Sequence, residues 1–342
     1  MKTIVSVNEI SEFEIKPRRE LTAWKEQVAT EIGERWSDKS RWVTVSCPVC
    51  ETDDRQHAFG KTGFSYSECA RCKTLYAHQR PEAAELDWWY KQSVSVSLWK
   101  EKLLRSTETS RLEKIIEPRA YWILDGISEY ISRQGASELV YTDVSFFGRA
   151  LVRKIAEDST GLKIISSGIT DAAAYAGTGI ESKPIASLAD ISLPAPTDIL
   201  VAIDVLERVF SIADFFSKME SSVNPGGLVF ATCPVASGFE IQTLWEQSPS
   251  VIPPDKLNLP TVSGLLELFA ASGSWKVLEL STPGMFDVET VKQTIDALPD
   301  KAWPRTLLAL VKHIDNQGAQ LFTEYLQSQR LSSFARIVLR RV

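Results

Sequence analysis

The sequence contains little histidine and no excess of basic residues. Its 342 residues include 3 histidines, 38 lysines and arginines, and 44 aspartates and glutamates, so the formal net charge is -6. Proteins that bind nucleic acid need clustered positive charge, and this balance argues against that class. No histidine lies between His78 and His313, so a base acting near neutral pH in this interval would have to be a carboxylate or a tyrosine.

Long apolar runs are also missing. A run such as ILVAI at 199–203 is far too short to span a bilayer, and MKTIVSVNEISEFEIK at 1–16 lacks the apolar core of a signal peptide. Hydrophobic residues make up 44% of the chain and charged residues 24%, which is typical of a soluble globular protein. We therefore expect a cytoplasmic protein with no membrane span and, at this length, two or three domains.

Cysteine is scarce, but four of the 5 cysteines lie in two close pairs. The pairs are CPVC (Cys47, Cys50) and CARC (Cys69, Cys72), separated by 18 residues. Two such knuckles can present four thiolates to one Zn²⁺. Four anionic ligands leave no open position, so the predicted zinc is structural. His57 and His78 are alternative ligands, but the cysteines already complete the set.

The pattern along the chain predicts four segments. They are an N-terminal helical segment (1–40), a zinc ribbon (41–80), a helical bridge (81–134) and an α/β domain (135–342). In the last segment, strand-like and helix-like stretches alternate, which predicts a mainly parallel sheet flanked by helices. The candidate strands are ELVYTDV, LKIISSG, DILVAID, GGLVFATC, WKVLELS and FARIVLRRV, and the candidate helices are 147–157, 212–222 and 261–272.

Four stretches of the second half carry a family resemblance: DILVAIDVLERV, NPGGLVFATCP, PPDKLNLPTVSGLLELFAASG and STPGMFDVETV. With the preceding zinc ribbon, they resemble the class I S-adenosylmethionine-dependent methyltransferases and are similar to the sugar C-methyltransferases. The resemblance implies a Rossmann-like seven-stranded sheet, S-adenosylmethionine as cofactor, and a role in polysaccharide biosynthesis. Relatives commonly have histidine where Arg208 and Lys256 stand.

Glycine is missing from the loop where that family binds its cofactor. The family's first strand ends in an acid followed by alternating glycines, whereas this chain has TDVSFFG at 142–148. Either Thr142 or Asp143 occupies the position of the acid, and Gly148 is the remaining glycine. These three are the candidate cofactor-binding residues.

A second departure follows at the end of the next strand. Where the family has an acid for the ribose, this chain has Ser166, Ser167 and Gly168, with Asp171 three positions later. Phe146 and Phe147 would also take up volume that the cofactor needs. Both departures predict weak or absent binding of S-adenosylmethionine.

The candidate catalytic residues are Glu207, Asp204 and Tyr90. Asp204 ends a predicted strand, and Glu207 follows three residues later as the candidate general base. The same D-x-x-E spacing is also that of a helix capping box, which needs no catalytic role. Tyr90, in WWYKQ, could reach the acceptor pocket or could serve interdomain packing.

Two functional hypotheses follow. The first is S-adenosylmethionine-dependent methyl transfer to a small-molecule carbohydrate or nucleotide-sugar acceptor, with an eroded cofactor site. The second is a catalytically inactive, methyltransferase-like binding or scaffold protein that engages a protein partner or a ligand. The sequence does not indicate a particular methyl acceptor or a particular oligomeric state.

Overall fold

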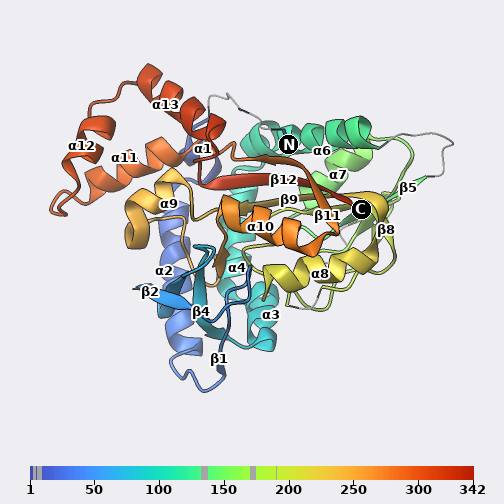
Figure 1. Ribbon diagram of the computed structural model, residues 1–342, viewed down its shortest axis with the longest axis horizontal. Helices are drawn as coiled ribbons and strands as arrows, with labels where there is room; N and C mark the ends of the chain where they lie inside the picture. Colours follow the sequence, from blue (N-terminus) through green and yellow to red (C-terminus); the bar gives the residue numbers. More distant parts are fainter. Residues whose placement is uncertain (3–4, 6–9, 132–137, 170–174, 190) are drawn as a thin grey trace.

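The computed structural model describes residues 1–2, 5, 10–131, 138–169, 175–189 and 191–342. The predicted boundary between 134 and 135 and the late acid Asp171 lie outside the described residues. The described chain forms two β-sheets with helices around them (Figure 1).

The large sheet is the centre of the α/β part. Its seven strands are arranged in the order β11-β12-β9-β8-β5-β6-β7, and β12 runs antiparallel to both of its neighbours. The order reverses between β5 and β8, which is the doubly wound pattern in which ligands bind at the carboxyl ends of the strands. The predicted Rossmann-like, class I methyltransferase fold is therefore confirmed. The strands are β5 (Leu139–Asp143), β6 (Leu162–Ser166), β7 (Glu181–Ser182), β8 (Thr197–Ala202), β9 (Val223–Pro234), β11 (Trp275–Ser281) and β12 (Phe334–Arg341).

Helices cover both faces of this sheet because neighbouring strand residues point to opposite sides. In β8, Ile199 and Val201 belong to a core shared with α6 (Glu117–Tyr130) and α7 (Arg149–Asp158). Leu200 and Ala202 belong to the opposite core, shared with α8 (Ile212–Ser222) and α10 (Val262–Ser272). The alternating apolar residues thus place one helical layer on each face (Figure 1).

The small sheet contains the cysteine pairs. Its strands β1 (Trp42–Thr44), β4 (Leu75–Pro81), β3 (Phe64–Cys69) and β2 (Arg55–Lys61) lie in that order and pair antiparallel. A fifth strand, β10 (Asn258–Leu259), comes from the α/β part and pairs with β4. Helix α2 (Arg18–Arg35) lies in the predicted N-terminal helical segment and buries an apolar face against this region, including Trp24, Val28 and Ile32.

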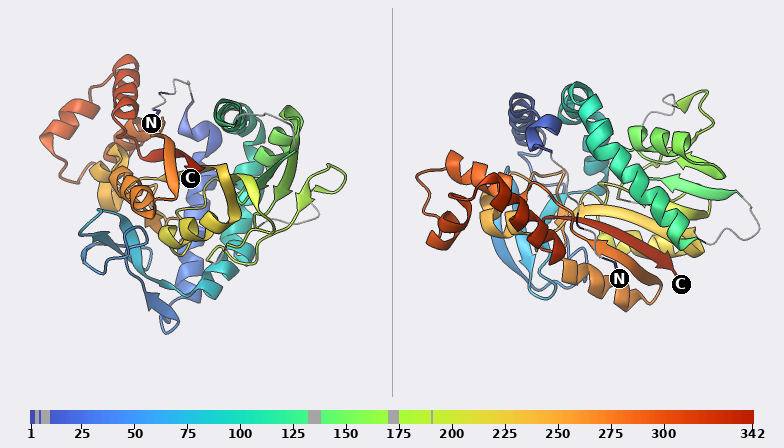
Figure 2. Two further views of the ribbon diagram at one scale, coloured as in Figure 1. Left: turned by 45° about the vertical axis from the view of Figure 1, so that its right-hand side comes forward. Right: turned by 90° about the horizontal axis from the view of Figure 1, so that it is seen from above.

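The remaining helices connect or flank the sheets. Helices α11 to α13 lie together at one end of the molecule, coloured orange to red in Figure 2. No helix in the described part of the chain is both long and apolar enough to cross a membrane. These helices are α1 (Glu12–Ile15), α3 (Ala83–Gln92), α4 (Val94–Leu98), α5 (Glu108–Arg111), α9 (Phe239–Leu244), α11 (Asp287–Ala297), α12 (Arg305–Val311) and α13 (Asn316–Ser328), with π-helical turns at Trp99–Leu104 and Leu112–Ile116 and a 3₁₀ turn at Trp245–Gln247.

Candidate functional site

A cavity of about 1720 Å³ lies at the carboxyl end of β8. Its wall includes Ser145, Phe147 and Gly148 from the loop after β5, and Asp204 and Glu207 from the loop after β8. The N-terminal helices and the segment before α11 complete the wall. The cavity thus occupies the position where doubly wound sheets bind their ligands.

Asp204 is the acidic residue of the β8 loop that faces this cavity. Its backbone is left-handed (φ 57°), which is uncommon for a residue other than glycine and costs energy that the surroundings must offset. The Asp204 N–H donates to Thr232 Oγ1 (3.1 Å), and the carbonyl of Asp204 accepts from Arg208 Nη1 (2.7 Å). The side chain remains 31% exposed, and Oδ2 lies 3.6 Å from Arg119 Nη1.

The carboxylate of Asp204 is a strong anion. Burial raises its pKa, but the positive charges of Arg119, Lys256 and Arg208 outweigh burial and lower that pKa to about 2. An acid of this strength is ionised at neutral pH and is a poor proton acceptor. Asp204 can therefore accept hydrogen bonds from a ligand, but it is not suited to act as a base.

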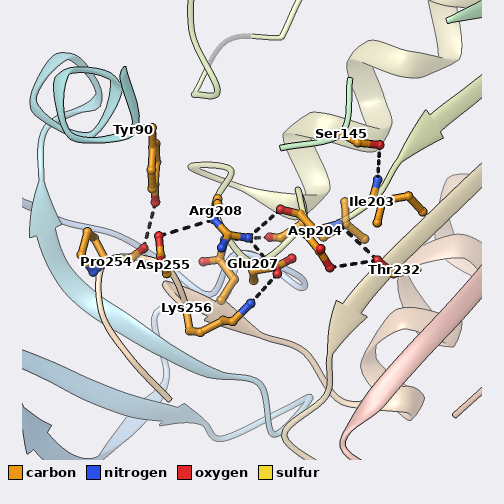
Figure 3. Close-up of polar contacts among 12 residues, drawn as sticks. Tyr90, Ser145, Ile203, Asp204, Glu207, Arg208, Thr232, Pro254, Asp255 and Lys256 are labelled. Atoms are coloured by element: carbon orange, nitrogen blue, oxygen red, sulfur yellow. Dashed lines mark hydrogen bonds and ion pairs between the residues drawn. The ribbon is translucent and has the colours of Figure 1, made fainter. Parts of the chain in front are cut away.

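Glu207 lies deeper than Asp204. Its side chain is fully buried, and Oε1 accepts from Lys256 Nζ (2.6 Å) and Arg208 Nη1 (3.0 Å). Oε2 has no hydrogen-bond partner among the described residues. Figure 3 shows Arg208 between Asp204, Glu207 and Asp255. Glu207, the candidate general base, is therefore part of a buried ion-pair network.

The capping-box interpretation of Asp204 and Glu207 is wrong, because no helix begins at this point. The chain forms turns from 203 to 208, and the next helix, α8, starts at Ile212. Ser211 caps that helix by accepting from the Asp214 N–H at 3.2 Å. The turns instead serve to direct the Asp204 side chain toward the cavity.

Tyr90 lies on α3 and is 1% exposed. Its hydroxyl donates to the Pro254 carbonyl (2.8 Å), and its ring packs edge-on against Phe146 with centroids 5.4 Å apart. Burial is the main cause that raises the pKa of Tyr90 well above its usual range. These contacts favour the packing role over proton transfer.

Three backbone amides of the loop after β5 have partners inside the protein. The N–H of Val144 donates to Val201 O (2.8 Å), and that of Phe146 donates to Ile203 O (3.1 Å). The N–H of Ser145 donates to Asp143 Oδ1 (2.9 Å). The loop therefore extends the pairing of β5 with β8, and these three amides are not available to a cofactor.

The three predicted cofactor residues lie close together but are turned inward. Asp143 is 1% exposed and accepts from the Tyr141 hydroxyl (3.2 Å), and burial raises its pKa to about 7. A Cβ on Gly148 would lie 2.6 Å from Asp143 Oδ1, so glycine is needed there for internal packing. Thr142 is fully buried.

These residues do not fit S-adenosylmethionine. Phe147 lines the cavity at the loop, with its ring centroid 4.4 Å from that of Phe146. At the end of β6, Ser166 donates to the Tyr175 hydroxyl (3.2 Å), and neither it nor Ser167 supplies a carboxylate. Three amides of the loop after β5 are thus closed to this cofactor, and the end of β6 lacks the carboxylate with which it would be held.

Arg119 was not identifiable from the sequence. It lies in the first turn of α6, and only the fold brings it beside Asp204. The sequence did point to Arg208 and Lys256, because they stand at positions where the family that the sequence resembles commonly has histidine. It did not point to Thr232 on β9, which holds the Asp204 amide.

The four paired cysteines form a cluster, as their spacing predicts. Their four Sγ atoms lie within 4.8 Å of one another, with Cys47 and Cys72 3.5 Å apart and Cys50 and Cys69 3.4 Å apart. Four sulfurs around a tetrahedral Zn²⁺ with bonds of about 2.3 Å would be about 3.8 Å apart. The donor set and its spacing therefore fit a structural zinc ion, and Cys47, Cys50, Cys69 and Cys72 would hold it.

No protein-family model and no curated protein matches this sequence. Among solved structures, a putative sarcosine dimethylglycine methyltransferase from Galdieria sulphuraria is 12% identical, with 66% of this chain and 85% of that chain covered and a TM-score of 0.43. An S-adenosylmethionine-dependent methyltransferase from Mesorhizobium loti is 16% identical (67% and 100% covered, TM-score 0.42). A geranyl diphosphate C-methyltransferase from Streptomyces coelicolor A3(2) is 13% identical (69% and 83% covered, TM-score 0.42). At these identities the similarity concerns the fold and not the reaction.

Proposed function

We propose that this protein uses the class I methyltransferase fold to bind a carbohydrate or nucleotide-sugar ligand, and that it does so without S-adenosylmethionine. The observation that carries the proposal is Asp204, an ionised carboxylate held in a left-handed backbone at the cavity wall. Carboxylates accept hydrogen bonds from hydroxyl groups, and charge-assisted bonds of this kind are among the stronger ones. A ligand rich in hydroxyl groups matches this acceptor.

The loop after β5 supports binding without the cofactor. Three of its amides are bonded within the protein, and its side chains at 146 and 147 are bulky phenylalanines. The packing of this loop thus favours binding without the cofactor.

Methyl transfer to a carbohydrate or nucleotide-sugar acceptor is the second candidate. It is favoured by the size of the cavity, since about 1720 Å³ exceeds the roughly 300–1,000 Å³ of a typical small-molecule site. Such a volume can hold a methyl donor and an acceptor together. In this case the cofactor would bind weakly through an eroded site.

Calorimetric titration distinguishes the two candidates. Purified, zinc-loaded protein is titrated with S-adenosylhomocysteine and, separately, with UDP-glucose, dTDP-glucose and GDP-mannose. We expect at least one nucleotide sugar to bind at micromolar strength, and no heat from S-adenosylhomocysteine up to millimolar concentration.

Micromolar binding of S-adenosylhomocysteine would overturn the first candidate and support the second. Transfer of a labelled methyl group to a bound nucleotide sugar would then establish the reaction. If folded protein binds none of these sugars, the proposed ligand class is wrong.

A further inference from the structure

Three arginines from different elements line the cavity around Asp204. Arg111 ends α5, Arg119 lies in the first turn of α6, and Arg336 is on β12. Arg119 Nη1 is 3.6 Å from Asp204 Oδ2. The charge of Arg119 acts on both Arg111 and Arg336, so the three guanidinium groups lie near one another in the cavity lining that includes Asp204.

Backbone and aromatic contacts position these guanidinium groups. Arg111 Nη1 donates to the Ile15 carbonyl (3.2 Å), and the Arg119 guanidinium lies 5.8 Å from the centroid of the Phe334 ring. Arg336 lies 5.2 Å from the centroid of the Trp122 ring, and its buried Nε has no hydrogen-bond partner among the described residues. Among the described residues, most of their N–H donors have no hydrogen-bond acceptor and can serve a ligand.

The negative charge nearby is too small to neutralise the cluster. Within the described chain, Asp204 is the one carboxylate at ion-pair distance from any of the three arginines. Burial, followed by repulsion from Arg119, lowers the pKa of Arg111 and of Arg336 to about 10. The negative charge of Glu279 offsets only part of this lowering for Arg336. Like charges gathered in a partly buried wall destabilise one another unless an anion binds between them.

We propose that Arg111, Arg119 and Arg336 form a binding site for the phosphate or diphosphate group of a small-molecule ligand. Guanidinium groups are the side chains best suited to this role, because their planar fork of donors matches phosphate oxygens. The cavity setting favours a small molecule over a nucleic acid. The inference rests on the proposed function for the remainder of the ligand, since a nucleotide sugar carries both hydroxyl groups and a diphosphate.

The test is a titration of full-length, zinc-loaded protein with sodium pyrophosphate at constant ionic strength. We expect saturable binding, and Arg119→Gln and Arg336→Gln each to weaken it about tenfold or more, as expected for loss of a charge-assisted bond. Arg105→Gln is the matched control, since Arg105 is exposed on the same cavity wall but outside the cluster. It should change the affinity less than twofold.

A second variant should strengthen pyrophosphate binding instead of weakening it. Asp204→Asn removes the carboxylate that offsets the arginines, and asparagine tolerates the left-handed backbone at this position. We expect pyrophosphate to bind at least about threefold more tightly to this variant, because one opposing charge is lost. A merely structural arginine cluster would not give tighter binding.

The outcomes separate this inference from the proposed function. Absence of saturable pyrophosphate binding, an equal loss in Arg105→Gln, or unchanged or weaker binding in Asp204→Asn overturns the phosphate site. Pyrophosphate binding without binding of any nucleotide sugar supports the phosphate site and overturns the proposed sugar ligand. Zinc content and melting curves confirm that each variant is folded, and an increase in the melting temperature of the wild-type protein with pyrophosphate is a measurement independent of the variants.

Discussion

Asp143 is a buried acid whose protonation changes within the physiological pH range. Its carboxylate accepts from the Ser145 N–H and the Tyr141 hydroxyl, yet burial raises its pKa to about 7. In the unfolded chain the pKa of an aspartate is about 3.9. The stability gained from the neutral folded form is therefore complete at low pH and is lost as the pH rises toward 7.

We predict that Asp143→Asn removes this pH dependence. Between pH 5.5 and 7, the free energy of unfolding of the wild-type protein should fall relative to the variant by about 1.6 kcal/mol, with a slope of about 1.4 kcal/mol for each pH unit at pH 5.5 that falls to half at pH 7. Chemical denaturation at both pH values measures the difference. Glu240, whose pKa burial also raises to about 7, titrates in both proteins and cancels in the comparison. A difference that stays constant with pH would contradict the prediction.

Position along the chain was enough to select Asp204 as a site candidate, because an acid at the end of a parallel strand reaches the ligand edge of the sheet. The sequence could not show that Asp204 faces the cavity while Glu207 is buried in ion pairs. That difference depends on a left-handed turn and on Arg119, which is far away in the sequence. The position of Asp204 at the cavity was thus predictable, and the orientation of the two side chains was not.

At the scale of the elements, two helical glycines have opposite environments. A Cβ on Gly126 of α6 would lie 2.7 Å from the ring of Phe230, which is fully buried on β9 and packs against Trp122. A Cβ on Gly33 of α2 would meet nothing within 4 Å. The first glycine permits a close helix–sheet contact, whereas the second has no such role.

We predict opposite changes in stability for the two alanine substitutions. Gly126→Ala should destabilise the protein by about 1–3 kcal/mol, because the Phe230 ring must shift within a packed core. Gly33→Ala should stabilise it by about 0.5–1 kcal/mol, because alanine loses less backbone entropy in a helix. Midpoints of urea denaturation test both. Equal effects of the two substitutions would show that the α6 contact is not tight.

The elements themselves were largely predictable. Six strands of the large sheet and helices α7, α8 and α10 follow from apolar periodicity and turn signals. The two-residue strand β7 was missed, since two residues carry no periodicity. The D-x-x-E spacing of Asp204 and Glu207 shows the opposite error, in which a local pattern matches a helix-capping motif although no helix follows.

At the scale of the whole molecule, the small sheet and the α/β part are joined. Strand β10 pairs with β4, and the Thr261 hydroxyl, which caps α10, donates to the Cys72 carbonyl at 2.7 Å. The cysteine cluster therefore touches the start of a helix of the large-sheet core. Loss of the metal should therefore destabilise the α/β part as well as the small sheet.

We predict that the protein holds one zinc ion per chain and that Cys72→Ser loses it. The melting temperature of the variant should fall by on the order of 10 °C in a single transition, because metal binding contributes directly to folding. Elemental analysis and calorimetry measure the two effects. Cys233→Ala is the control, since Cys233 lies in β9 outside the cluster. Unchanged zinc in Cys72→Ser, or a separate early transition of the small sheet, would contradict this prediction.

The contribution of β10 also fixes an order of events during synthesis on the ribosome. The cysteines and strands β1 to β4 emerge early, but β10, which pairs with Leu75 and Tyr76 of β4 beyond the end of β1, emerges only after β5 to β9. The first residues of β4 thus lack a partner on one side while most of the large sheet is made, and unpaired backbone of this kind favours aggregation. Early capture of the metal would protect the nascent chain during this interval.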